Sequence, residues 1–300
     1  MQPSNFQTFK LGLIGYPLGH SLSPKIHTAA LKACGLDGDY SLFPIHLDDK
    51  QGLKDLLACV RAKEIHGLNV TIPHKQNVIP LLDELTSTAQ TIGAVNTIYL
   101  RDEKLIGDNT DAPGFLSDLK RFLTMECDSL LSHLQDQAPA FQKRTLVLGA
   151  GGSARAVVYA LTNDGWNAAI AARRIEQAQE LASQFKNTNA IELNLQTFQP
   201  FDFAQGELSN FQLIVNTTPV GMTPNIDRSP LPENISLSSR TMIYDLVYNP
   251  RETKLIKDAR AQGLFATTGL GMLIEQAALA FELWTGHNPS RNVLFDSVVE

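Results

Sequence analysis

Short apolar runs alternate with segments of helical periodicity over roughly the first hundred residues. Lys10–Gly15 is an apolar run that ends in Gly and Pro, as a buried strand does, and Pro24–Cys34 has helical spacing up to Gly35. The elements predicted after these are strand Asp39–Ile45, helix Asp48–Cys59, strand Ile65–Val70, helix Leu81–Thr91 and a hairpin of Ala94–Leu100 with Lys104–Gly107. This order of strands and helices predicts an α/β domain with a mostly parallel sheet.

The same alternation starts again at Arg144, after a predicted helix Asp111–Leu123 and a polar stretch to which the pattern assigns no element. The elements predicted in this half are strand Thr145–Leu148, helix Ser153–Thr162, strand Ala168–Ala171, helix Glu176–Phe185, strands Phe211–Asn216 and Met242–Leu246, and helix Glu252–Gln262. The polar segment Gly221–Ser239 is predicted to be a loop over the ligand crevice. Leu270–Trp284 has the composition of a helix that is buried on most of its surface.

The chain is therefore expected to contain two α/β domains. A length of 300 residues fits this expectation, since a single core rarely grows beyond roughly 250–300 residues. We place the first domain at residues 1–112, completed by about 265–300, and the second at 143–264. A linker helix and connecting segment are predicted at 113–142.

Composition and charge exclude several classes of function. The fractions of hydrophobic residues (43%) and charged residues (19%) are those of an ordinary soluble globular protein. The net charge of −6, with both signs interspersed, argues against a nucleic-acid or anionic-membrane surface.

There is no run of eighteen apolar residues and no apolar N-terminal segment, so neither a membrane span nor a signal peptide is expected. The three cysteines and seven histidines form no cluster, which predicts a cytoplasmic protein without a disulfide framework or a metal site built by the protein.

A glycine-rich turn closes the strand at Thr145–Leu148 and opens the helix that follows. It reads Gly149-Ala150-Gly151-Gly152-Ser153-Ala154 and matches the dinucleotide fingerprint in the strand–turn–helix context that this fingerprint requires. Gly149 permits the tight turn, Gly151 lets the backbone approach a pyrophosphate, and Ala154 allows close helix packing. The motif thus predicts dinucleotide binding at a helix N-terminus. The alternative is a purely structural turn.

The end of the next strand distinguishes between the two nicotinamide dinucleotides. Arg173 and Arg174 stand there, and no carboxylate precedes Glu176. A carboxylate would bind the ribose 2′-hydroxyl of NAD, whereas an arginine can bind the 2′-phosphate of NADP. NADP is therefore predicted, and one of the two arginines is expected to be only a solvated surface residue.

Polar residues also gather where elements of the first domain begin or end. Ser21 and Ser23 precede a predicted helix whose first residue is Pro24. Ser23 is expected to be the N-cap, and the additional hydroxyl of Ser21 favours binding of a carboxylate or polyol.

A second group of polar residues lies at the carboxyl end of the predicted strand Ile65–Val70, where open α/β sheets bind ligands. This group comprises Asn69, Thr71 and Lys75. Further amides and carboxylates occur at the turns Gly93–Thr97 and Gly107–Asp111. Each feature has a plainer interpretation: a loop lysine is usually solvated, and Asn or Asp at a turn often only forms the turn or caps a helix.

Taken together and in this order, the motifs resemble those of the shikimate dehydrogenase family from about Leu11 to Gly286. The segments that carry the resemblance are Ser21-Leu22-Ser23-Pro24, Asn69–Lys75, Gly93–Thr97, Asn109–Asp111, the glycine-rich turn, Val215–Met222, Asp245–Pro250, Gly269–Leu273, Gln276-Ala277 and Trp284-Thr285-Gly286. Each segment alone is a weak signal, but their ordered co-occurrence is highly specific.

The resemblance implies a role for each matching residue. Lys75 and Asp111 resemble the family's catalytic pair. Positions that contact the substrate are Ser21, Ser23, Thr71, Asn96, Tyr248 and Gln276. Positions that bind NADP are Gly149, Ala150, Gly151, Gly152, Ser153, Ala154, Arg173, Arg174, Asn216, Thr217, Thr218, Met222, Gly269 and Met272. The first domain is then expected to bind the substrate and the second to be a Rossmann-type NADP-binding domain, with a C-terminal helix returning to the first. The implied partner is a small-molecule substrate, and the chain is expected to be a monomer or homodimer.

The implied reaction is the NADP-dependent reduction of 3-dehydroshikimate to shikimate. A cationic Lys75 at the carbonyl oxygen would stabilise the developing alkoxide and deliver the proton. A neighbouring Asp111 would position the ammonium group and favour its charged form. Lys75 is then either the proton donor or mainly an electrostatic group, with proton delivery shared by Asp111 or water.

Three other functions are weighed against this one. The nearest is a quinate/shikimate dehydrogenase that uses NAD. Ser21 and Ser23 favour shikimate and the two arginines favour NADP, but neither feature excludes quinate activity. A non-catalytic sensor of shikimate or quinate would be expected to lack the Lys–Asp pair or the glycine turn, and a different two-domain NADP dehydrogenase would lack the ordered substrate motifs. The departures from the family are Thr28 in place of the common Asn, Ala112-Pro113 where a glycine is usual, and a long Glu126–Gln142 segment.

Overall fold

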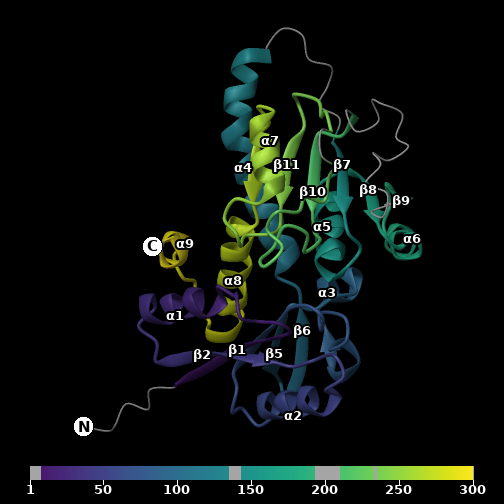
Figure 1. Cartoon of the computed structure of the whole chain (residues 1–300). Helices are drawn as coiled ribbons and strands as arrows, with labels where there is room; N and C mark the ends of the chain where they lie inside the picture. Colours follow the sequence, from purple (N-terminus) through teal and green to yellow (C-terminus); the bar gives the residue numbers. More distant parts are fainter. Residues whose placement is uncertain (1–7, 135–142, 193–209, 233–234, 300) are drawn as a thin grey trace. The chain divides into compact units, whose positions relative to one another are not determined.

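The computed structural model describes residues 8–134, 143–192, 210–232 and 235–299, with side chains except at 126–134 and 192 (Figure 1). The chain divides into two compact units. Unit 1 is Met1–Gly114 with Leu273–Glu300, and unit 2 is Phe115–Met272. The boundaries fall inside two helices, α4 (Asp111–Leu134) and α8 (Leu270–Thr285). Within the described residues, no helix is both long and apolar enough to cross a membrane.

Unit 1 contains a six-stranded mixed sheet with the order β2-β1-β3-β5-β6-β4. Its strands are β1 (Phe9–Gly15), β2 (Gly38–Pro44), β3 (Gly67–Val70), β4 (Glu84–Leu85), β5 (Thr97–Arg101) and β6 (Lys104–Asp108). Strand β1 runs parallel to β2 and β3, whereas β5 is antiparallel to both of its neighbours, β3 and β6. Three of the five strand pairs are parallel, so the prediction of a mostly parallel sheet is confirmed, and β5–β6 is the predicted hairpin. A hairpin such as β5–β6 joins antiparallel strands, and it pairs with β3 through its antiparallel arm.

The helix predicted over Leu81–Thr91 forms only in its second half. Residues Ile79–Leu81 make a short 3-10 helix (η1), β4 follows, and α3 spans Ser87–Ile92. Asp83 stops any longer helix, because its carboxylate accepts hydrogen bonds from Leu105 N (2.7 Å) and from the Arg61 guanidinium (2.6 and 2.9 Å). These bonds link the segment to other elements, and such tertiary interactions override a local helical pattern.

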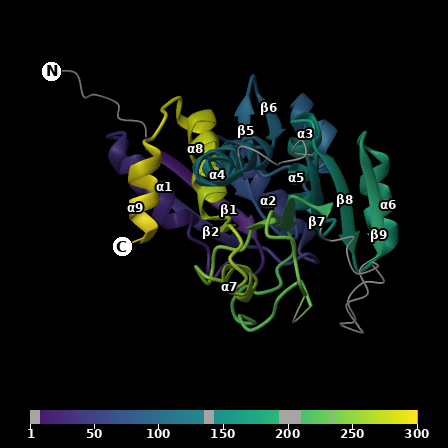
Figure 2. The same ribbon diagram turned by 90° about the horizontal axis from the view of Figure 1, so that it is seen from above.

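Three further helices complete unit 1 around the sheet: α1 (Ser23–Ala33), α2 (Lys50–Arg61) and α9 (Arg291–Val299). The last of these was not predicted, and it lies beside α1 in both views (Figures 1 and 2). Trp284 holds α8 against the sheet by donating from Nε1 to Ile98 O (3.2 Å). Only glycine fits at position 67 opposite it, because a Cβ there would lie 2.3 Å from the indole ring.

Unit 2 contains an all-parallel, six-stranded sheet with the order β12-β11-β10-β7-β8-β9. Its strands are β7 (Arg144–Leu148), β8 (Asn167–Ala172), β9 (Thr188–Glu192), β10 (Leu213–Asn216), β11 (Met242–Asp245) and β12 (Ala266–Thr268). Taken from β9 to β12, this is the strand order of the dinucleotide-binding Rossmann fold, whose ligands bind where the order reverses, between its first and fourth strands. Here those strands are β7 and β10, so the Rossmann prediction is confirmed.

Among the described residues of unit 2, three helices connect these strands: α5 (Gly152–Asn163), α6 (Ile175–Ser183) and α7 (Lys254–Ala261). Helix α6 lies along the β8–β9 edge of the sheet (Figures 1 and 2). Strands β9 and β12 were not predicted. Helix α4 continues well past the predicted end at Leu123, and the remainder of the Glu126–Gln142 segment, residues 135–142, lies outside the described residues. The described part of Gly221–Ser239 contains no helix or strand.

Candidate active site

Lys75 and Asp111 form a buried ion pair in unit 1. Lys75 lies in the loop after β3, where its carbonyl accepts a hydrogen bond from Val95 N (2.7 Å), and Asp111 is the first residue of α4. The Lys75 ammonium donates to Asp111 Oδ2, with 14% of the lysine side chain and 6% of the aspartate side chain exposed. Lysine is rarely buried this far without a partner. The plainer interpretation of Lys75 as a solvated loop residue is therefore wrong.

Asn96 connects this ion pair to α8. Its Nδ2 lies 2.9 Å from Asp111 Oδ1, 2.9 Å from Thr110 Oγ1 and 3.2 Å from Gln276 Oε1. Its Oδ1 accepts from Thr110 N (2.7 Å). Both Asn96 and Gln276 are buried. Four of the predicted site residues, Lys75, Asp111, Asn96 and Gln276, thus belong to one hydrogen-bonded group within unit 1.

Asn69 anchors the strands beneath this group. Its Oδ1 accepts from Tyr40 Oη (2.8 Å), and its Nδ2 donates to Asn96 O (3.3 Å) and Thr97 Oγ1 (3.2 Å). The ring of His27 stacks on that of Tyr40, with centroids 4.4 Å apart and planes 3° from parallel. Neither Tyr40 nor His27 was predicted to support the site, because β2 and α1 meet Asn69 only in the folded chain.

The loops that carry Ser21 and Thr71 leave the sheet at the same edge. Strands β1 and β3 are parallel, and the loops that follow them are joined by a hydrogen bond from Tyr16 N to Ile72 O (3.0 Å). Ser23 was predicted to cap α1, but it is itself the first helical residue. The N-cap position belongs to Leu22, which supplies no side-chain cap, and the Ser21 hydroxyl accepts a hydrogen bond from Ser23 N–H (3.2 Å) just ahead of the helix.

Ala112-Pro113, the departure nearest to the ion pair, fits the start of α4 without distorting it. Asn109 Oδ1 accepts from Ala112 N (3.1 Å), and Gly114 N donates to Thr110 O (3.0 Å). Pro113 therefore falls in the first helical turn, where a missing N–H removes no intrahelical hydrogen bond. The helix begins at Asp111 despite the proline.

In unit 2, the glycine-rich turn has the geometry of a phosphate cradle. Gly149 has φ +112°, and a Cβ there would lie 2.5 Å from Thr217 Oγ1, whereas a Cβ on Gly151 would meet nothing within 4 Å. Among the described side chains, none caps α5. A close-fitting turn, an open approach at Gly151 and a helix N-terminus without a side-chain cap together suit a pyrophosphate, which the backbone N–H groups can bind directly. The residues present therefore fit a dinucleotide.

Arg173 and Arg174 follow β8, and both are exposed. Strand β8 is the neighbour of β7, so its carboxyl end lies on the same edge of the sheet as the glycine turn. This is the edge at which a Rossmann fold binds the adenosine ribose. Guanidinium groups at this position suit the 2′-phosphate of NADP.

The remaining predicted cofactor residues lie after β10 and at the start of α8. Thr217 donates from N (2.9 Å) and Oγ1 (2.7 Å) to Leu148 O, which joins the loop after β10 to the glycine turn. Met222 is 40% exposed farther along this loop, whereas Gly269 and Met272 are buried. Tyr248 also lies in unit 2, after β11, and burial raises the pKa of its phenol.

Comparisons with known proteins agree with this geometry. Residues 13–98 match the shikimate dehydrogenase substrate binding domain, residues 132–253 match the shikimate / quinate 5-dehydrogenase family, and residues 269–294 match the shikimate 5'-dehydrogenase C-terminal domain. The NADP⁺-dependent shikimate dehydrogenase of Shouchella clausii is 39% identical over 96% of both chains. The chain belongs to the shikimate dehydrogenase family.

Solved members of this family show which ligands its fold accepts. The shikimate 5-dehydrogenase of Thermus thermophilus, solved with NADP(H) and shikimate, has a TM-score of 0.78 and 35% identity over 96% of this chain and 98% of its own. The quinate dehydrogenase of Corynebacterium glutamicum, solved with NAD, has a TM-score of 0.79 and 30% identity over 97% and 99%. These matches identify the chain as an NAD(P)-dependent oxidoreductase of the shikimate/quinate dehydrogenase family.

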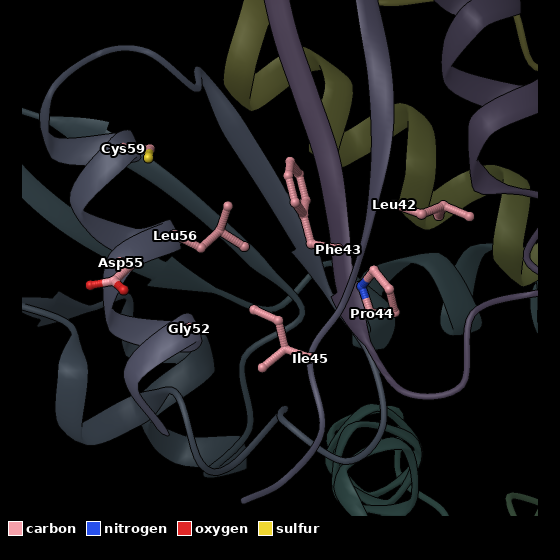
Figure 3. Close-up of a pocket in the computed structure, with 8 residues that line it drawn as sticks. All are labelled: Leu42, Phe43, Pro44, Ile45, Gly52, Asp55, Leu56 and Cys59. Carbon is pink, nitrogen blue, oxygen red and sulfur yellow. The ribbon is translucent and has the colours of Figure 1, made fainter. Parts of the chain in front are cut away.

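Unit 1 also has an apolar pocket that contains none of the predicted site residues. About 370 Å³ in volume, it lies between the end of β2 and α2 and is lined by Leu42, Phe43, Pro44, Ile45, Gly52, Asp55, Leu56 and Cys59 (Figure 3). In the part of the chain that the structure describes, no group of three or more His, Cys, Asp or Glu side chains is placed to hold a metal ion.

Proposed function

We propose that this protein is an NADP-dependent shikimate dehydrogenase, which reversibly reduces 3-dehydroshikimate to shikimate in the biosynthesis of aromatic amino acids. The observation that carries the proposal is the buried Lys75–Asp111 ion pair, held by Asn96 at the carboxyl edge of the unit 1 sheet. A ketone reductase needs a fixed hydrogen-bond donor, neutral or positive, where the carbonyl oxygen gains charge, and a lysine ammonium is such a donor.

The neighbouring polar groups suit a substrate with a carboxylate and several hydroxyls. Ser21 and Ser23 stand at the N-terminus of α1, where the helix dipole favours an anion, and we assign the substrate carboxylate to their hydroxyls. Amide and hydroxyl groups bind hydroxyls in either direction, because each can donate and accept. We assign the substrate hydroxyls to Thr71, Asn96, Tyr248 and Gln276.

Each residue of the Lys–Asp pair has a distinct task in this proposal. When bound, NADPH supplies the hydride that reduces the carbonyl carbon. The Lys75 ammonium donates a hydrogen bond to the carbonyl oxygen, stabilises the charge that develops there and delivers the proton. Asp111 holds that ammonium in place through Oδ2, while Asn96 fixes Asp111 through Oδ1. The task of Asn96 is thus partly to hold the aspartate, beyond any contact with substrate.

NADP is the proposed cofactor because the two arginines after β8 replace the carboxylate that binds the ribose of NAD. The second candidate function is quinate oxidation with NAD. It is favoured by the 30% identity to the quinate dehydrogenase of C. glutamicum, which was solved with NAD. Shikimate and NADP remain our proposal, since both Ser21 and Ser23 are present at the start of α1 and both arginines follow β8.

Reduction of the dinucleotide, followed by absorbance, tests the proposal with shikimate or quinate and with NADP⁺ or NAD⁺. We expect fast turnover with shikimate and NADP⁺ only. Lys75→Ala should lower kcat about 100-fold or more, the usual scale of general acid–base effects. Lys63→Ala, which removes an exposed lysine paired with Glu103, is the matched control and should keep wild-type turnover. Preference for quinate and NAD⁺, or near wild-type kcat in Lys75→Ala, would refute the proposal.

A further inference from the structure

Asp245, the last residue of β11, is a buried carboxylate with several partners on the ligand side of unit 2. Its side chain is fully buried and accepts hydrogen bonds from three separate segments. Oδ1 accepts from Asn216 Nδ2 (2.8 Å) and Val247 N (3.0 Å), and Oδ2 accepts from Thr253 Oγ1 (2.6 Å). All three partners are neutral donors, so among the described residues this carboxylate is not half of an ion pair.

The bond to Asn216 leads to the glycine-rich turn. Asn216 Oδ1 accepts from Thr218 N (3.0 Å) and Thr218 Oγ1 (2.7 Å), which fixes the first residues after β10. A Cβ at Gly149 would meet Thr217 Oγ1 at 2.5 Å and Thr218 Cγ2 at 3.2 Å, so these residues pack directly on the turn. Asp245 therefore orients an amide that in turn shapes the wall of the dinucleotide cradle.

The bond to Val247 reaches a second loop at the same edge. Val247 precedes Tyr248, and this loop is joined to the first by hydrogen bonds between Thr223 and Asn249 (N to O, 3.1 Å, and Oγ1 to Oδ1, 3.3 Å). The third bond, to Thr253, belongs to the N-cap of α7, whose hydroxyl accepts Ile256 N (3.3 Å). Two of the three hydrogen bonds of Asp245 thus hold loops at the ligand edge of the sheet, and the third holds the N-terminus of α7.

The choice of a carboxylate at this position favours a role beyond packing. Burial raises the pKa of Asp245 to about 6, in spite of its three hydrogen bonds, so the charged form is disfavoured by its surroundings. An apolar residue at this position would avoid the free-energy cost of burying a carboxylate. A carboxylate accepts from all three donors at once, whereas an amide would present N–H to the Thr253 hydroxyl and leave the O–H of Thr253 without this acceptor.

We propose that Asp245 is a positioning residue that holds the Asn216–Met222 loop and the Tyr248 loop in their ligand-binding arrangement without touching either ligand. This inference rests on the proposed function, which assigns NADP to the first loop and the substrate to Tyr248. Because both loops depend on one side chain, a change at Asp245 weakens the binding of two ligands together.

Three variants of the full-length chain separate positioning from stability. Asp245→Ala removes the acceptor for both loops. Asp245→Asn keeps an oxygen that can face Asn216 and Val247, and loses only the acceptor for Thr253. Thr253→Val is the matched control, because it removes the same buried bond to Oδ2 and the helix cap but leaves both loop bonds intact. For each chain, kcat and the KM values for NADP⁺ and shikimate are measured, together with the thermal midpoint and NADPH binding by fluorescence.

We expect Asp245→Ala to raise both KM values and the NADPH dissociation constant by about 10-fold or more, since small displacements of binding groups have effects of this order. Asp245→Asn should restore both KM values to within about 3-fold of wild type, and Thr253→Val should lower the thermal midpoint with KM values within about 2-fold. The proposal is overturned if Asp245→Ala leaves both KM values unchanged, or if Thr253→Val raises them equally. Asp245→Ser replaces the alanine variant if that chain does not fold, and an Asn variant that also fails to restore KM refutes the oxygen-acceptor role.

The wild-type chain keeps this test separate from that of the proposed function. If wild type turns over quinate with NAD⁺ instead, the proposed function fails. The same variants are then compared with wild type on that substrate pair, and the ratios of variant to wild-type KM values still decide the role of Asp245.

Discussion

The buried imidazole of His27 makes the stability of this protein depend on pH in a direction that the structure fixes. The ring is fully buried in unit 1, stacked on Tyr40 and 5.3 Å from the centroid of Trp284. Burial lowers the pKa of His27 from 6.5 to about 3, and the nearby Asn69 side chain offsets only part of that effect. An imidazolium here would lose its hydration without gaining a carboxylate partner among the described residues. The folded chain therefore keeps the ring neutral.

The sign and size of the effect follow from proton linkage. The unfolded chain binds a proton at His27 below about pH 6.5, and the folded chain does not until about pH 3. The neutral ring thus contributes stability that is complete above pH 6.5 and is lost as the pH falls. At pH 5 the loss is about 2 kcal/mol, from about 1.4 kcal/mol for each pH unit below the unfolded pKa.

His27→Phe tests this reasoning, because phenylalanine keeps an aromatic ring in the stack and removes the titrating group. Urea unfolding of both chains between pH 8 and pH 5 should show wild type losing about 2 kcal/mol relative to the variant. Asp245 acts with the opposite sign, but it is present in both chains and cancels in the difference. Phe281→Leu, which alters the same cluster without removing a titrating group, should give a difference that is independent of pH. A wild-type-minus-His27→Phe difference that stays constant from pH 8 to pH 5 would refute the argument.

Three further predictions concern unit 2. Gly149→Ala should weaken NADPH binding about 10-fold or more in a fluorescence titration, because its φ of +112° and its contacts leave no room for a Cβ. Gly165→Ala is its control, with φ +84° but open space around the Cβ, and should cost about 1 kcal/mol of stability without affecting NADPH. Arg173→Ala with Arg174→Ala should raise KM for NADP⁺ and leave KM for NAD⁺ nearly unchanged, and an unchanged NADP/NAD preference would contradict the assignment. The pKa of Asp245 is raised from 3.8 to about 6, so the contribution of its protonated form to the free energy of unfolding is complete below pH 3.8 and is lost as the pH rises through 6. Between pH 4 and pH 7, the stability of Asp245→Asn should therefore rise by up to about 3 kcal/mol relative to that of wild type. A stability difference in urea unfolding that does not change with pH would contradict this.

Much of the fold is predictable from the sequence because its signals are local. Apolar runs gave most of the longer strands of both sheets, and the glycine turn indicated the dinucleotide-binding half. The strands that were missed in unit 2, Thr188–Glu192 and Ala266–Thr268, lie at the two edges of its sheet and carry mixed or small side chains. Their conformation comes from backbone pairing with β8 and β11, which a pattern of side chains does not record.

The candidate site likewise has features that the sequence predicts and features that it does not. Motif residues such as Lys75 and Asp111 stand out in the sequence, since each belongs to a short segment with an unusual combination of polar groups. The hydrogen bonds between site residues do not stand out, because the partners are distant along the chain: Asn96 and Gln276, both predicted as site residues, bond to each other across 180 positions. Tyr40 beside Asn69 is a further example, and its alternating strand gives no sign of the hydrogen bond it makes.

Two buried aspartates illustrate how the chain uses charge. Asp111 and Asp245 are both almost fully excluded from water, and each accepts from an asparagine side chain. Asp111 also meets the Lys75 ammonium, so that pair is neutral overall and carries a positive group that can act on a substrate oxygen. Asp245 has only neutral donors among the described residues, and its raised pKa records the uncompensated cost. A buried carboxylate without a cation beside it lowers stability when it is charged. Asp245 lies where two loops meet at the ligand edge, and its contribution to the protein is therefore to fix the geometry of those loops.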